Sequence, residues 1–153
     1  GGLHKLAGIT ANAFIGHKND FMIQDCIMVS KKLGINFYFN DKFPINSLYL
    51  MRGTLVLEEN LLKKYIDIFF ESYWQLNLDL SDRKIFEKKL NEIGVDINKF
   101  FKDIENQSIK DKLKEITNEA FTKKIFGAPS FIHKDIVYWG QDRLDYLIDN
   151  ISK

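Results

Sequence analysis

The side chains able to do acid, base or nucleophilic chemistry are few and scattered in this sequence. Cys26 is the one cysteine, so no intrachain disulfide and no Cys-x-x-Cys redox pair can form. The three histidines are His4, His17 and His133, and none has other metal-binding residue types around it at the spacing of a metal site. No phosphate-binding loop, dinucleotide fingerprint or Ser-His-Asp order occurs. The residues alone therefore predict no catalytic group and no metal site.

Two segments near the C-terminus have residue types suited to ligand binding. Ala128-Pro129 precedes a short β-prone run, and the backbone of a strand edge can read a peptide ligand without any side chain. The alternative is an ordinary trans proline at the start of an edge strand, because only about 5–6% of X-Pro bonds are cis. Gln141-Asp142-Arg143 begins a helix, where capping and a surface charge pair are sufficient explanations for the charges.

A third candidate segment, Phe43-Pro44-Ile45-Asn46, precedes a predicted helix over Ile45–Leu57. Proline suits the first turn of a helix, so the residues alone indicate helix initiation above a packed aromatic ring. Arg52 lies one and a half turns further on and is either a structural ion-pair partner or an anion contact.

Helical periodicity dominates from Asp20 onward and gives way to a β-prone texture near the C-terminus. The predicted helices are 21–33 ended by Gly34, 45–57, 60–75, one capped by Ser81 or Asp82, one capped by Asp96, one from a capping box at Ser108, and 141–151. Residues 129–133 and 136–139 predict a hairpin across Lys134-Asp135. An isolated hairpin is marginally stable, so we expect further strands beside it, from a longer parent chain or a second molecule.

Composition restricts the class of protein. With 153 residues, 45% of them hydrophobic, the chain is the size of one globular domain. The formal charge of +1 does not indicate the excess of basic residues that binds nucleic acid or an anionic membrane. No apolar run is long enough to span a bilayer. A single cysteine suits a reducing compartment, so we expect a cytoplasmic protein.

Three stretches together carry a resemblance to a known family. They are Asn40-Asp41-Lys42-Phe43-Pro44-Ile45-Asn46-Ser47 running into Leu50-Met51-Arg52-Gly53, then Ile125-Phe126-Gly127-Ala128-Pro129-Ser130-Phe131, and Tyr138-Trp139-Gly140-Gln141-Asp142-Arg143-Leu144. In this order they resemble the 2-hydroxychromene-2-carboxylate isomerase and kappa-class glutathione transferase family. The resemblance implies an α/β thioredoxin-like fold with an inserted α-helical domain. Its parts would be residues 1–18, the end of the N-terminal thioredoxin half; 19–107, the helical insert; and 108–153, the C-terminal half.

The same resemblance implies a ligand and a reaction. Glutathione would be the cofactor, its thiolate adding to and leaving a conjugated carboxylate substrate in a cis/trans isomerisation. Pro129 would be cis. The implied glutathione contacts are Ala128, Pro129, Gln141, Asp142 and Asn12, and the implied substrate pocket is Phe43, Pro44, Asn46 and Arg52. The nucleophile-bearing strand–helix–strand segment that opens family members is expected to be missing here, leaving the hairpin edge and an adjoining apolar surface uncovered near Gly1. The expected partners are a second copy of the chain and a small aromatic or conjugated carboxylate, with no nucleic acid or membrane.

Other functions stay open on the sequence. A DsbA-like thiol-disulfide oxidoreductase or a glutathione transferase would share the fold, and the former needs a cysteine at the start of the missing helix. A non-catalytic helical interaction module is an alternative from a different class. It predicts a folded monomer without affinity for glutathione.

Overall fold

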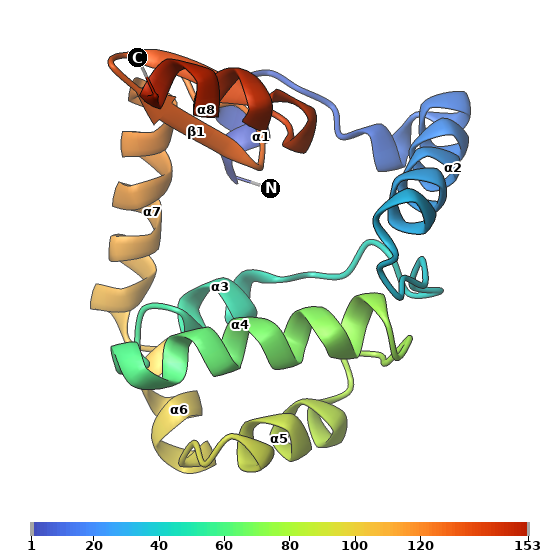
Figure 1. The fold of residues 1–153 in the computed structure, drawn as a ribbon. Coiled ribbons are helices and arrows are strands. Elements are labelled where there is room, and N and C mark those ends of the chain that lie inside the picture. The colour runs from blue at the N-terminus through green and yellow to red at the C-terminus, as the bar shows by residue number, and fades with distance from the viewer. Residues whose placement is uncertain (1, 153) are drawn as a thin grey trace. The chain divides into compact units, whose positions relative to one another are not determined.

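The computed structural model describes residues 2–152 of the chain (Figure 1). The elements are α1 (Gly2–Leu6), η1 (Asn12–Phe14), α2 (Gly16–Leu33), α3 (Leu48–Gly53), α4 (Glu59–Trp74), α5 (Arg83–Glu92), α6 (Ile97–Ile104), α7 (Gln107–Thr122), β1 (Ser130–His133), β2 (Ile136–Trp139), η2 (Gln141–Arg143) and α8 (Leu144–Ile151). They form two compact units, and α7 runs through both. One unit is Asn12–Leu113, and the other holds the ends of the chain, up to Ala11 and from Lys114.

The helical unit is built on aromatic packing between α4, α5 and α6. Helix α4 places Tyr65, Phe69 and Tyr73 on one face because four residues advance a helix by little more than one turn. Phe69 stacks on Phe86 of α5 at 4.5 Å between ring centroids. The buried residues of this core are Tyr65, Phe69, Tyr73, Leu80, Phe86, Leu90, Val95, Phe100 and Ile104. Side chains of this size dominate core energetics, so this unit has a substantial core of its own.

Helix ends follow the capping residues, with one correction. The Asp82 carboxylate accepts from the Lys84 backbone N–H, and the Asp96 carboxylate accepts from Lys99, as the sequence predicts. Gly34 is left-handed at the end of α2, also as predicted. The predicted capping box at Ser108 is wrong, because α7 begins at Gln107, two residues before the start that a cap at Ser108 implies. There Asn106 accepts from the Ser108 N–H at 3.2 Å.

Helix α3 is shorter than the predicted 45–57. Asn46 accepts from the Leu48 N–H through its side chain at 3.2 Å, and this local turn holds the chain outside the helix until Leu48. Pro44 therefore lies before the helix and not in its first turn. The Phe43–Pro44 peptide bond is cis, which the sequence analysis did not predict.

Helix α2 buries no residue against the described part of its unit. Several of its apolar side chains are exposed; for example, Phe21 is 62% exposed and Leu33 is 58% exposed. Cys26 is half-buried and is therefore not a fully buried core thiol.

The β-hairpin forms where the sequence predicts it. Phe131 pairs with Tyr138 and His133 with Ile136 in an antiparallel ladder, the one sheet among the described residues. Both turn residues, Lys134 and Asp135, have positive φ, which is typical of the two-residue turns that match strand twist. The apolar side chains of Ile132, Ile136 and Trp139 are 43%, 52% and 51% exposed. Gly1, expected nearby, lies outside the described residues.

An ion-pair network joins α3, the end of α6 and the start of α7. Glu105 lies 3.1 Å from the Arg52 guanidinium and 2.6 Å from the Lys110 ammonium. The hydrogen bond from Lys110 is the largest cause that lowers the pKa of Glu105, and together with the charges of Lys110 and Arg52 it outweighs the opposing effect of desolvation. Arg52 thus makes a structural ion pair, one of the two alternatives left open by the sequence, and its contact with an anion stays a prediction.

We predict that Gly53→Ala lowers the free energy of unfolding although alanine is the better helix former. A Cβ at Gly53 would lie 2.7 Å from the Tyr65 ring and 2.8 Å from the Phe100 ring, so the packed core must shift. The expected loss is about 1–3 kcal/mol in urea denaturation. Gly16→Ala is the matched control, because no atom lies within 4 Å of its added Cβ. Equal stability of the two variants would contradict the packing described.

The Glu105 network predicts a pH-dependent contribution to stability. A carboxyl whose pKa is lowered by folding stabilises the native state above its unfolded pKa, and this contribution disappears as the pH falls through the folded pKa. Near neutral pH, the free energy of unfolding of the wild type should therefore exceed that of Glu105→Gln. This difference should shrink as the pH falls below about 4.5, the ordinary pKa of the carboxyl. Glu71→Gln, on the exposed surface of α4, is the control. A difference that does not vary with pH would contradict the prediction.

Candidate functional site

The loop between α7 and β1 presents a free segment of backbone. The Ala128–Pro129 bond is cis, as predicted. The Ser130 hydroxyl donates to the Gly127 carbonyl at 2.6 Å, which closes the loop on itself. Ala128 is exposed, and no described residue hydrogen-bonds to its N–H or its C=O. These two groups are available to pair with the backbone of a ligand.

A backbone hydrogen bond connects this loop to the start of the last helix. The Gly140 N–H donates to the Pro129 carbonyl at 3.0 Å, and η2 begins at the next residue. Gln141 and Asp142 thus begin the last helical segment, as predicted, and this start lies beside the Ala128–Pro129 turn. Because η2 continues into α8, both side chains are held at the end of a helix.

Gly140 is the residue that allows this connection. Its φ of +101° lies in a region that favours glycine. A Cβ at this position would overlap the Asp142 carboxylate, which folds back over Gly140. The sequence analysis did not single out Gly140, although a glycine between a strand and a helix start is a signal of unusual backbone geometry.

The electrostatics of the helix start are those of an exposed acid and a neighbouring cation. The Asp142 carboxylate lies 3.3 Å from the Arg143 guanidinium, with side chains 60% and 52% exposed. An ion pair this exposed contributes little to stability, so the Asp142 carboxylate can exchange Arg143 for a cationic group on a ligand. Gln141 is exposed, and its side chain makes no hydrogen bond to another described residue.

The remaining predicted contacts belong to the helical unit. Asn12 begins η1, where its carbonyl accepts from Ile15 at 3.0 Å and its side chain is exposed. Its role toward glutathione stays a prediction. Among the predicted pocket residues, Pro44 and Asn46 are exposed and Arg52 is paired with Glu105. The structure thus gathers Ala128, Pro129, Gln141 and Asp142 in one unit, and Asn12 with the pocket residues in the other.

Phe43 belongs to an aromatic cluster that the sequence analysis missed. Its ring centroid lies 5.1 Å from Phe39 and 5.7 Å from Trp74 of α4, and Phe37 stacks on Trp74 at 5.8 Å. The Tyr38 N–H donates to the Trp74 carbonyl, which fixes this extended segment on the end of α4. The four rings are half-buried, so they offer a partly open aromatic surface next to Pro44. The sequence signal was the Phe-x-Phe spacing, which periodicity alone does not pair with Trp74.

The described residues offer no activated nucleophile and no metal site. Burial first, and then the charge of Asp25, raise the pKa of the Cys26 thiol, which is the opposite of the shift that activates a cysteine. No group of three or more His, Cys, Asp or Glu side chains within residues 2–152 could hold a metal ion. In the same range, every helix is too short or too polar to cross a membrane.

Comparisons with known proteins identify the family. The model of the DSBA-like thioredoxin domain matches residues 3–152. A 2-hydroxychromene-2-carboxylate isomerase of Sphingobium xenophagum is 22% identical over 83 residues, which are 54% of this chain and 43% of that protein. A solved structure of 2-hydroxychromene-2-carboxylate isomerase matches at a TM-score of 0.85 and 21% identity, covering 98% of this chain and 74% of the other. That likeness confirms the fold class predicted from the sequence. The chain belongs to the DSBA-like thioredoxin domain family.

Proposed function

We propose that the protein is a glutathione-dependent isomerase of the 2-hydroxychromene-2-carboxylate isomerase type. The observation that carries the proposal is the hydrogen bond from Gly140 to Pro129, which holds a free backbone segment beside the acidic start of a helix. The likeness to two proteins named as this isomerase supports the reaction class. Because one fold serves many chemistries, the substrate is part of the proposal.

The residues of the loop and the helix start fit a peptide-like ligand with charged ends. The free N–H and C=O of Ala128 would pair with the cysteine backbone of glutathione as an added strand segment does. Asp142 would accept from the α-amino group of the γ-glutamyl end, and helix-start N–H groups with Gln141 would donate to its α-carboxylate.

The chemistry of the proposed reaction divides between ligand and protein. When bound, glutathione supplies a thiolate whose addition to a conjugated double bond, and later elimination, lets that bond rotate. The loop and the helix start orient that ligand. The role of Phe43, Pro44 and Asn46 as substrate contacts stays a prediction, since these residues belong to the other unit. No described residue is assigned a catalytic role, and the raised pKa of Cys26 argues against a disulfide-exchange function for that thiol.

We predict that Asp142→Ala weakens the binding of glutathione by about 1–3 kcal/mol, because the ammonium group loses its charged partner. Isothermal titration calorimetry with reduced glutathione measures this change. Asp145→Ala, in the first turn of α8, is the matched control, since it removes an acidic side chain from the same helix end. If both variants bind like wild type, the helix start is not the γ-glutamyl site.

We predict that the protein accelerates the interconversion of 2-hydroxychromene-2-carboxylate and its ring-opened isomer only when glutathione is present. Absorbance spectroscopy follows the reaction with glutathione, with S-methylglutathione and with neither. S-methylglutathione retains the backbone contacts but has no free thiol, so it should bind and give no acceleration. Acceleration without a thiol would contradict the proposed chemistry. Glutathione binding without acceleration would retain the ligand site and reject this substrate.

A further inference from the structure

The outer edge of β2 is a free row of backbone groups that the proposed function does not use. The bond from the Gly140 N–H to the Pro129 carbonyl makes these two residues a hydrogen-bonded pair of the ladder. Hydrogen-bonded and non-hydrogen-bonded pairs alternate along antiparallel strands. The pairs Phe131–Tyr138 and His133–Ile136 are therefore bonded, and Ile132–Val137 and Ser130–Trp139 are not.

This register decides which backbone groups point away from the hairpin. In a non-hydrogen-bonded pair, the N–H and C=O groups of each strand face outward. On β2 these are the groups of Val137 and Trp139. No described residue outside the hairpin hydrogen-bonds to either backbone. The edge therefore presents two donors and two acceptors at the spacing that an added strand requires.

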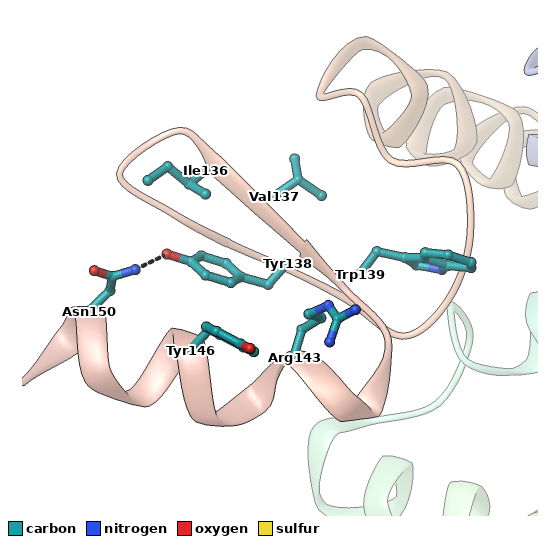
Figure 2. A pocket seen from close by; sticks show the side chains of 7 residues that line it. All are labelled: Ile136, Val137, Tyr138, Trp139, Arg143, Tyr146 and Asn150. Atoms are coloured by element: carbon teal, nitrogen blue, oxygen red, sulfur yellow. Dashed lines mark hydrogen bonds between the residues drawn. The ribbon is translucent and has the colours of Figure 1, made fainter.

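An open pocket of about 570 Å³ runs beside this edge. It is lined by all four residues of β2, by none of β1, by Arg143 at the end of η2 and by two residues one turn apart on α8 (Figure 2). These are Ile136, Val137, Tyr138, Trp139, Arg143, Tyr146 and Asn150. Asn150 donates to the Tyr138 hydroxyl at 2.6 Å, which fixes α8 against the strand. A groove between an edge strand and a helix is the geometry in which extended peptides bind by strand addition.

The charges of the groove indicate the kind of segment that fits. Arg143 is the one charged side chain in the lining, and no carboxylate lines it. The guanidinium lies 5.7 Å over the Tyr146 ring, and its contact with Asp142 is exposed and weak. An acidic residue of an incoming strand can therefore pair with Arg143. A second copy of β2, whose sequence Ile-Val-Tyr-Trp carries no charge, would leave Arg143 without such a partner.

We propose that β2 and α8 form a docking groove for an extended, proline-free protein segment that carries an acidic residue. The segment pairs its backbone with Val137 and Trp139 and places a carboxylate on Arg143. Its apolar side chains lie over Tyr146 and Ile136, which are 61% and 52% exposed. This site uses neither the Ala128 backbone nor the Asp142 carboxylate, and it is connected to the proposed glutathione site through the ion pair between Arg143 and Asp142.

The test uses the full chain, labelled with ¹⁵N, and the probe peptide acetyl-Thr-Val-Thr-Val-Glu-Thr-amide. The expected result is saturable shifts of the Val137 and Trp139 amide signals in heteronuclear NMR spectra. Val137→Pro removes the outward N–H without removing a hairpin bond and should abolish the shifts, whereas Val137→Thr should bind within about twofold of wild type. The same peptide with N-methyl groups on alternate residues should not bind, and this arm does not depend on the folding of a protein variant.

The charge is tested separately. Arg143→Gln should weaken the binding of the glutamate peptide by about fivefold or more, as expected for loss of a charged hydrogen-bond partner. It should leave the binding of the matching glutamine peptide unchanged. Equal binding of the N-methylated peptide, or no shift at Val137 and Trp139 at millimolar peptide, would overturn the proposal. So would sedimentation showing a dimer of the chain that Val137→Pro dissociates, because the occupant would then be a second copy.

Discussion

The hydrogen bond between the Gly140 N–H and the Pro129 carbonyl fixes several features of the C-terminal unit at once. Proline has no N–H to return, so this single bond sets the register at the open end of the hairpin. The register determines which backbone groups pair within the hairpin and which face outward at its two edges. The same bond holds the start of η2 against the loop that contains Ala128. The proposed ligand contacts, which come from these two segments, therefore depend on this one hydrogen bond.

The helical unit depends on a different constraint, which is the close packing of aromatic rings. Gly53 lies directly against the Tyr65 ring, and the Tyr65 hydroxyl donates to the Leu50 carbonyl at 3.0 Å. Burial raises the pKa of that hydroxyl, so the group stays protonated and keeps its hydrogen bond. This packing fixes α3 on α4. It thereby positions Arg52 to reach Glu105 and keeps it in an ion pair within the protein.

How far the sequence predicts the structure depends on the range of the interactions involved. The long helices, the caps at Asp82 and Asp96 and the hairpin follow from local patterns and are confirmed. The cis bond at Pro129 came from the family resemblance, because the residues alone favour trans. The predicted limits of α3 were wrong because the turn closed by the Asn46 side chain on the Leu48 N–H competes with the helix. The role of Arg52 could not be decided, because its partner lies 53 residues further along the chain.

The account rests on the claim that the loop and the helix start together form a glutathione site. Amide chemical shifts of the ¹⁵N-labelled chain, recorded during titration with glutathione, test this claim most directly. The account predicts saturable shifts at Ala128, Gly140, Gln141 and Asp142, with one common dissociation constant and no change at Val137. Shifts that do not saturate, or that occur at other residues while these four signals stay fixed, would contradict it.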